Sequence, residues 1–203
     1  MALGVFLVVE DGIVRRSLRE LVQSDRELEL VGQAAGVSQA MAGIPHSEPD
    51  VALLDDRLPD GNGFDLCKEL RSLLPMLQCI IFASFGSTEV MLNAIQAGAS
   101  GCLIRNAKGV ETLAAIKDAA AGDVLLDTGV ASAWLASQVR EDFLDVASAM
   151  TEREIELLGL LAAGHTDSQI VDRMSIDDKI FRGYLWTLIA KAQASGGGRR
   201  GLK

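Results

Sequence analysis

The chain has few cysteines, and their arrangement excludes a cross-linked protein. The 203 residues include three cysteines, Cys67, Cys79 and Cys102, which are odd in number and irregularly spaced. They lie within strand-like or helix-like patterns, so neither a disulfide framework nor a cysteine metal site is indicated. We therefore expect reduced thiols and a cytoplasmic location.

The chain also lacks long apolar runs. Although 49% of its residues are hydrophobic, no apolar run approaches the length that a membrane-spanning helix needs. The N-terminal segment MALGVFLVVEDG has no basic residue before its apolar stretch, and acidic residues follow that stretch at once. This segment does not resemble a signal peptide, so we expect a protein with a large buried core and no membrane partner.

An excess of basic residues is absent as well. The formal net charge is −9, and residues 151–203 hold 8 Lys and Arg against 7 Asp and Glu. Without Arg199, Arg200 and Lys203, the same segment would hold 5 basic residues against 7 acidic ones. Because contacts with phosphates supply much of the affinity for nucleic acid, the charge alone gives no support to DNA binding.

Residues 1–122 contain a regular alternation of short apolar runs and amphipathic segments. The apolar runs predict strands at 5–9, 28–34, 51–54, 79–83 and 101–104. The amphipathic segments predict helices at 14–23, 38–43, 63–74, 88–97 and 110–121. Strands that alternate with helices at this spacing predict βαβ units, and hence an α/β domain with a parallel sheet.

The rest of the chain has a different pattern. Residues 123–150 predict a helical linker. Residues 151–192 predict three short helices with polar caps, the second at 167–174 and the third at 177–191. Three such helices joined by tight turns predict a small all-α helix-turn-helix domain. The glycine-rich residues 193–203 predict a flexible basic tail.

Carboxylates follow two of the predicted strands. Asp55 comes directly after the apolar run at 51–54, and Glu10 and Asp11 follow the first strand. The carboxyl ends of strands form the sites of open α/β sheets, and acids clustered there repel one another unless a cation lies between them. Mg²⁺ suits that role, and Asp55 could then attack a phosphoryl donor and form an acyl phosphate. The alternative is an acidic, solvated sheet edge whose carboxylates only cap helices.

Several motifs resemble those of the NarL/FixJ response regulators, in which a receiver domain precedes a LuxR-type helix-turn-helix. The matching segments are Glu10-Asp11, Asp55-Asp56-Arg57-Leu58-Pro59 with Gly63, residues 97–101, and TEREIELLGLLAAG at 151–164. The resemblance covers nearly the whole chain and implies a doubly wound, flavodoxin-like receiver domain at 1–122. It also implies that a sensor histidine kinase phosphorylates Asp55, that the chain dimerises, and that its partner is DNA. The implied Mg²⁺ ligands are Glu10, Asp11, Asp55 and the Arg57 carbonyl.

The receiver motifs depart from the family pattern at the positions that carry chemistry and switching. The family's hydroxyl residue at the end of the fourth strand falls on Ala83, with Ser84 one place later. Its strand-five lysine is Arg105, whose planar fork replaces a compact ammonium imperfectly, and its switch aromatic is Cys102. Asp56 adds a second acid beside the phosphoacceptor.

The acid pair itself can be matched in two registers. An ungapped match puts Val9 and Glu10, rather than Glu10 and Asp11, at the acidic positions and leaves one ligand. Together with the other departures, this predicts a weakened Mg²⁺ site and an impaired phosphorylation switch.

The helix-turn-helix motif departs from the family as well. By the resemblance, the DNA-contacting candidates are Lys179, Arg182, Tyr184 and Trp186. The pair that opens the second helix is Asp167-Ser168, which places negative charge toward phosphate. Ile180 and Gly183 replace polar contacts, and a glycine costs a helix interior about 1 kcal/mol relative to alanine. Residues 193–203 offer no sign of the family's fourth helix.

Two functions fit these patterns. The first is a two-component transcriptional regulator that dimerises and binds DNA, with impaired phosphorylation switching. The alternative is a protein-interaction module that does not bind DNA and modulates a related regulator. A third function, that of a haloacid-dehalogenase-like phosphatase, is set aside because Arg57 stands where that family needs its second acid. We therefore expect a protein that is not an enzyme.

Overall fold

The computed structural model describes residues 2–84, 86–123, 125, 128–136 and 150–196, the last four of them as backbone only. The chain divides into two compact units, Met1–Leu125 and Leu126–Lys203. Within the described residues, no helix combines the length and apolar character that a membrane span requires.

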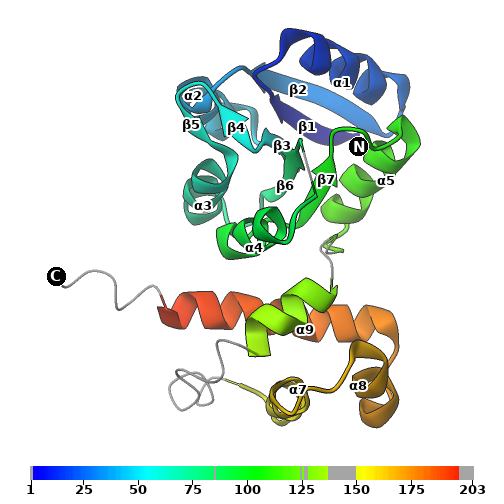
Figure 1. Ribbon diagram of the computed structural model, residues 1–203. Coiled ribbons are helices and arrows are strands. Elements are labelled where there is room, and N and C mark those ends of the chain that lie inside the picture. The colour runs from blue at the N-terminus through cyan, green and yellow to red at the C-terminus, as the bar shows by residue number, and fades with distance from the viewer. Residues whose placement is uncertain (1, 85, 124, 126–127, 137–149, 197–203) are drawn as a thin grey trace, which may run out of the picture. The chain divides into compact units, whose positions relative to one another are not determined.

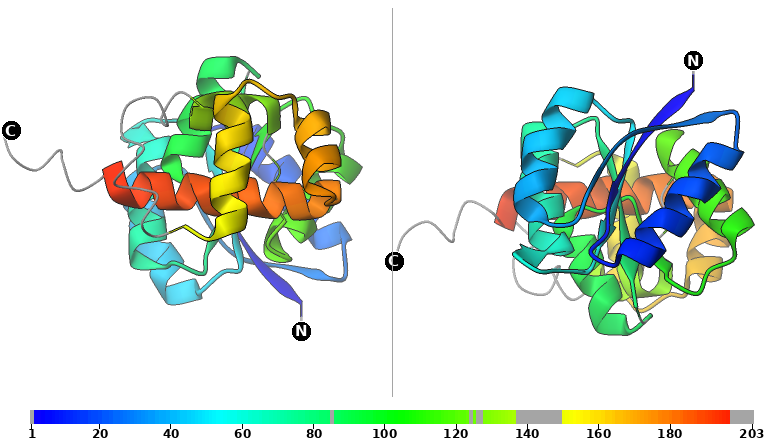
Figure 2. Two further views of the ribbon diagram at one scale, coloured as in Figure 1. Left: turned by 90° about the horizontal axis from the view of Figure 1, so that it is seen from below. Right: turned by 90° about the horizontal axis from the view of Figure 1, so that it is seen from above.

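The first unit is a five-stranded sheet between two layers of helices (Figures 1 and 2). Its strands are β1 (Leu3–Val8), β2 (Leu28–Ala34), β3 (Val51–Asp55), β6 (Gln78–Ala83) and β7 (Gly101–Ile104). Its helices are α1 (Gly12–Ser24), α2 (Val37–Ser47), α3 (Gly63–Leu73), α4 (Thr88–Ala97) and α5 (Gly109–Ala120). Neighbouring strands are parallel in the order β2-β1-β3-β6-β7. Helices α1 and α5 pack on one face and α2, α3 and α4 on the other, which confirms the doubly wound α/β fold.

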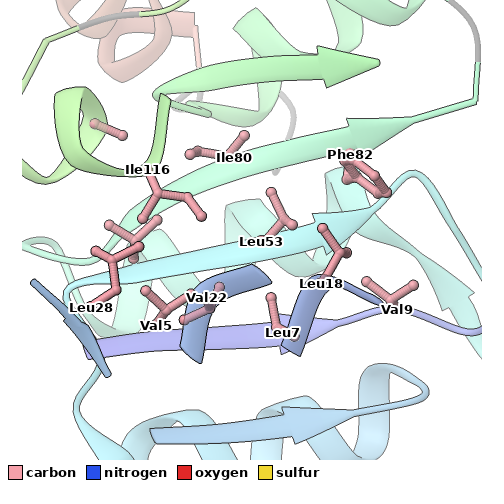
Figure 3. Packing of buried hydrophobic residues seen from close by; sticks show 12 residues of the cluster. Val5, Leu7, Val9, Leu18, Val22, Leu28, Leu53, Ile80, Phe82 and Ile116 are labelled. Atoms are coloured by element: carbon pink, nitrogen blue, oxygen red, sulfur yellow. The ribbon is translucent and has the colours of Figure 1, made fainter. Parts of the chain in front are cut away.

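A core between the sheet and the α1/α5 layer fixes the ends of the central strands (Figure 3). Its residues include Val5, Leu7, Leu53, Ile80 and Phe82 from the strands, Leu18, Val22 and Ile116 from the helices, and Val9 just after β1. Strand β3 is buried at every position, as expected for a central parallel strand. Because this strand ends in Asp55, it places a buried carboxylate at the carboxyl edge of the sheet.

A short hairpin follows β3, in the segment between the predicted strand at 51–54 and the predicted helix at 63–74. Its strands are β4 (Arg57–Leu58) and β5 (Gly61–Asn62), which pair antiparallel. Gly63 then begins α3, and a Cβ at this position would lie 2.2 Å from the Asp55 carbonyl oxygen. Only glycine allows this close approach of the backbone, so Gly63 helps to fix the position of Asp55.

The second unit is all-α, which confirms the second part of the predicted fold class. Its helices are 128–136, α7 (Glu152–Ala162), α8 (Asp167–Met174) and α9 (Asp178–Gly196). Thr151 and Thr166 cap α7 and α8 through their side chains, and Asp177 Oδ1 accepts a hydrogen bond from the Ile180 amide at 2.7 Å. Of the predicted linker, 128–136 is helical and 137–149 lies outside the described residues.

Two helix ends correct the predicted boundaries. Helix α2 does not stop at residue 43 but continues to Ser47 with Pro45 inside it, although Pro45 has no amide to donate to the Met41 carbonyl. Helix α9 runs to Gly196, into the segment predicted as a flexible tail. The alternating alanines of residues 190–194 are good helix formers and extend the helix.

Candidate functional site

Asp55 is the central residue of the carboxyl edge of the sheet. It is the last residue of β3, and its side chain is fully buried. Its Oδ2 accepts a hydrogen bond from the Glu10 amide at 3.4 Å, and its Oδ1 accepts one from Nη2 of Arg105. The phosphoacceptor candidate is therefore already paired with a cation.

Arg105 reaches Asp55 because β6 and β7 end side by side. The Arg105 amide follows β7 and donates a hydrogen bond of 2.9 Å to the Ala83 carbonyl at the end of β6. Its guanidinium carbon lies 5.9 Å from the centre of the Phe82 ring, within the range of a cation–π contact. The Arg105 side chain is 27% exposed and that of Asp55 is 0% exposed, so the guanidinium borders solvent and the carboxylate does not.

Asp56 makes the site a pair of carboxylates that share one guanidinium. Its Oδ1 lies 4.0 Å from Nη2 of Arg105, and its Oδ2 lies 3.9 Å from Nε of the exposed Arg57. Two buried atoms of this group, Asp56 Oδ1 and Arg105 Nε, have no hydrogen-bond partner among the described residues. Buried polar atoms are rarely left this way, so the group carries an uncompensated acceptor and an uncompensated donor.

The electrostatics of the site follow from this burial. Burial raises the pKa of the Asp55 carboxyl above its ordinary value, against the opposing effect of the Arg105 guanidinium, and the neighbouring Asp56 raises it further. Burial, reinforced by the charge of Asp56, also raises the pKa of the Cys102 thiol to about 11. Cys102 is therefore a neutral and unreactive thiol at neutral pH.

The two acids after β1 do not extend their carboxylates to Asp55. The Asp11 carboxylate caps α1 and accepts hydrogen bonds from the amides of Ile13 (2.8 Å) and Val14 (3.2 Å), which lower its pKa. Glu10 is exposed, and its contact with Asp55 is made by its backbone amide. Among the described residues, no group of three or more His, Cys, Asp or Glu side chains is arranged to hold a metal ion.

The predicted switch positions surround the site but differ in burial. Ala83 is the fully buried last residue of β6, Ser84 follows it and is half-buried, and Cys102 is buried in β7. Arg57 lies in β4 with an exposed side chain, so only its carbonyl remains a ligand candidate. Of the switch positions, only Arg105 donates a side-chain hydrogen bond to Asp55 among the described residues.

The helix-turn-helix residues form a mixed surface on α9. Lys179 and Arg182 are exposed, whereas Tyr184 and Trp186 are half-buried. Ile180 is 46% exposed beside them. Asp167 has a role that the sequence did not reveal, because its Oδ1 accepts a hydrogen bond of 2.8 Å from Ser132 Oγ of helix 128–136. No local pattern signals this contact, which joins residues 35 positions apart.

A doubly wound domain with a buried aspartate at its central strand end, followed by a helix-turn-helix, defines the receiver–effector class of regulators. A model of the response regulator receiver domain matches residues 5–121. Over 188 residues the chain is 47% identical to the DNA-binding transcriptional activator DevR/DosR of Mycobacterium tuberculosis, covering 92% of this chain and 87% of that protein. It is 25% identical to the nitrate/nitrite response regulator protein NarL of Escherichia coli, covering 92% and 88%. A LuxR-family response regulator from Aurantimonas has a crystal structure that aligns with a TM-score of 0.60 at 25% identity, over 64% of this chain and 94% of that one.

The chain belongs to the response regulator family. It is a two-component response regulator, and the relatives named above are regulators rather than enzymes. Receiver domains generally bind Mg²⁺ in the acidic pocket beside the phosphoacceptor. The residues present here do not fit that ion, because Arg105 is paired with Asp55, Asp11 caps a helix and Val9 lies in the core.

Proposed function

We propose that this protein is a DNA-binding transcription regulator whose output does not depend on phosphorylation of Asp55. In this proposal residues 1–122 are the receiver domain, 123–150 the linker, 151–192 the DNA-binding domain and 193–203 a basic tail. The observation that carries the proposal is the guanidinium of Arg105 on the buried carboxylate of Asp55.

Two features of the site oppose phosphorylation of Asp55. An attacking Asp55 oxygen must be free, yet Oδ1 is bound by Arg105 and Oδ2 faces the Glu10 amide. A phosphoryl group on Asp55 would also place negative charge beside the buried Asp56. Like charges in a buried site repel each other strongly, so the product would be destabilised as well.

DNA binding is supported by the exposed face of α9. Lys179 and Arg182 are three residues apart and therefore share a helix face, where their charges can meet phosphates. A recognition helix enters the major groove with such a face. Trp186, four residues after Arg182, shares this face, whereas Tyr184, two residues after Arg182, does not. We propose weak, salt-sensitive and poorly selective binding, since Gly183 offers no contact and Asp167 adds negative charge.

The proposed partners follow from the family. Its members work with sensor histidine kinases, DNA and a second regulator chain. For this chain we propose a reduced response to any kinase, and dimerisation either with itself or with a related regulator.

Beryllofluoride, a mimic of the phosphoryl group, tests the receiver half of the proposal. We expect the mass of the full chain in sedimentation velocity to be the same with and without beryllofluoride and Mg²⁺. The same protein treated with acetyl phosphate should gain no phosphoryl mass. Mg²⁺-dependent labelling of Asp55 followed by dimerisation would contradict the proposal.

Fluorescence anisotropy with a labelled DNA duplex tests the other half. We expect Arg182→Ala to weaken binding and to reduce the salt dependence by about one unit of slope. Lys68→Ala, an exposed substitution in the first unit, serves as the matched control and should change neither. Tight, sequence-selective binding at physiological salt would show that the helix-turn-helix retains full function.

A protein-interaction function remains the second candidate, because Ile180 exposes 46% of its surface on the recognition helix. Exposed apolar residues at such a position favour protein contacts over phosphate contacts. Mixing the chain with its DevR/DosR relative distinguishes the two functions. A mixed complex that forms without DNA and is lost on Ile180→Lys would support the interaction module.

A further inference from the structure

We infer that Arg105 is the resident cation of the receiver site and takes the place of the divalent ion. This inference deepens the proposed insensitivity to phosphorylation by naming its cause. It rests on the ion pair between Arg105 and Asp55, the position of the neighbouring acids, and the unpartnered atoms beside them.

The charge of the site supports this assignment. Two buried carboxylates, Asp55 and Asp56, would repel each other without a cation between them. Nη2 of Arg105 donates to Asp55 Oδ1 and lies 4.0 Å from Asp56 Oδ1. One guanidinium therefore lies beside both carboxylates and supplies a positive charge to the pair.

Two of the positions that a divalent ion would need do not offer it a free carboxylate. Val9 is packed in the core, and the Asp11 carboxylate accepts two helix amides at 2.8 and 3.2 Å. The carbonyl oxygens at the end of β1 are also engaged, because Arg15 Nη1 donates to those of Val9 and Glu10. An oxygen-rich site for a hard cation is therefore not assembled beside Asp55.

The buried atom Asp56 Oδ1 indicates how the site would respond to the loss of Arg105. Among the described residues the buried Asp56 Oδ1 has no hydrogen-bond partner, so it is available to a cation. Without the guanidinium, the negative charges of Asp55 and Asp56 would lose the cation that they share. We expect a divalent ion to enter at that point, because two negative charges that are largely removed from water attract a cation more strongly than exposed ones do.

Binding of Mn²⁺ to the full chain, followed by the electron paramagnetic resonance signal of the free ion, tests this inference. The wild type should bind no Mn²⁺ at Asp55. Arg105→Ala should bind Mn²⁺ at least about tenfold more tightly than the detection limit that the wild type sets, and Asp55→Asn in that background should abolish the gain. The assay contains neither a phosphoryl donor nor DNA, so its outcome is independent of the proposed regulatory function.

Arg26→Ala is the matched control, since it removes an exposed arginine that precedes β2, at the amino end of the strands and opposite to Asp55. Its removal should leave Mn²⁺ binding unchanged. If Arg105→Ala does not fold, Arg105→Lys replaces it in the assay, because a compact ammonium vacates part of the site and should also admit the ion. Mn²⁺ binding by the wild type that is lost in Asp55→Asn, or no gain in a folded Arg105 variant, would overturn the inference.

Discussion

In each unit a buried acid forms an ion pair with a basic residue, and the two pairs are built differently. In the second unit, Lys191 Nζ donates to both oxygens of Glu154 at 2.9 and 2.7 Å. The amide and hydroxyl of Thr151 also donate to Glu154, at 2.6 and 3.0 Å. In the first unit, Asp55 pairs with Arg105 while Asp56 Oδ1 and Arg105 Nε are left without partners.

The Glu154–Lys191 pair has a structural role, whereas the Asp55–Arg105 pair lies at the candidate functional site. Glu154 closes a capping box and ties α7 to α9, so every contact it makes stabilises the helix-turn-helix. The Asp55 pair lies at a sheet edge where its family carries out chemistry, and its buried charges are incompletely satisfied. Their pKa shifts are accordingly opposite, lowered for Glu154 and raised for Asp55.

Arg105→Ala should have the largest effect on stability. Removing one partner of a buried pair leaves the other charge uncompensated, which costs about 3 kcal/mol. Urea denaturation followed by hydrogen exchange in residues of the first unit measures the loss. In the double variant Arg105→Ala/Asp55→Asn much of the stability should return, because no buried charge is then left alone. A loss of equal size in the double variant would mean that Arg105 stabilises through packing instead.

Glu154→Gln should have a smaller effect, confined to the second unit. It removes the charge-assisted bonds from Lys191 while keeping the size of the side chain, at a cost of about 1–3 kcal/mol. Both tryptophans of the chain, Trp134 and Trp186, lie in this unit, so tryptophan fluorescence follows its unfolding. The matched control is Glu156→Gln, because Glu156 forms an exposed pair with Arg153 that is worth about 0.5 kcal/mol or less. Equal losses in the two variants would contradict the structural role of Glu154.

The two acids should also respond oppositely to pH. Burial alone would raise the pKa of Glu154, but Lys191 and Thr151 lower it below its ordinary value of 4.5. Its contribution to stability is therefore present above pH 4.5 and is lost as the pH falls through the lowered pKa. The pKa of Asp55 is raised above 3.8, so its contribution is present below that pH and is lost as the pH rises through the raised pKa.

Differences between wild type and the variants Glu154→Gln and Asp55→Asn isolate these two contributions. Unfolding free energies measured from pH 3 to pH 7 should give slopes of opposite sign. Slopes of the same sign would remove the distinction between the two pairs.

Gly183→Ala should have the smallest effect and a favourable one. Nothing lies within 4 Å of a Cβ built at Gly183, which is inside α9. Alanine should therefore stabilise the second unit by about 0.5–1 kcal/mol, measured by tryptophan fluorescence. Gly63→Ala is the contrasting variant, because its Cβ would lie 2.2 Å from the Asp55 carbonyl oxygen and should destabilise the first unit. A loss of stability in Gly183→Ala would contradict this expectation, because it would require a steric clash where the structure leaves open space.

Much of the fold was predictable because strong local signals coincide with its elements. The β-strands 28–34 and 101–104 and the helices 88–97 and 167–174 agree with the structure at both ends. Apolar runs define such strands, and polar caps define such helices. The β4–β5 hairpin was missed because strands of two residues have no periodicity to detect.

The positions of the candidate site residues in the fold could be predicted from the sequence, but their contacts could not. The strand-end position of Asp55 follows from the apolar run before it, and Arg105 was recognised as an altered position. Arg105 and Asp55 are 50 residues apart in the sequence. Their direct contact depends on the parallel register of β6 and β7. The contacts of Asp11 could not be predicted either. The sequence left helix capping open as an alternative role for Asp11, and this role depends on the path of the backbone at the start of α1.

A crystal of the full chain grown with Mg²⁺ and beryllofluoride would test the central claim most directly. We predict that the guanidinium of Arg105 remains on the Asp55 carboxylate, with no ion beside it. A Mg²⁺ ion bound to Asp55, the Arg57 carbonyl and a carboxylate of Glu10 or Asp11, with Arg105 displaced, would contradict it.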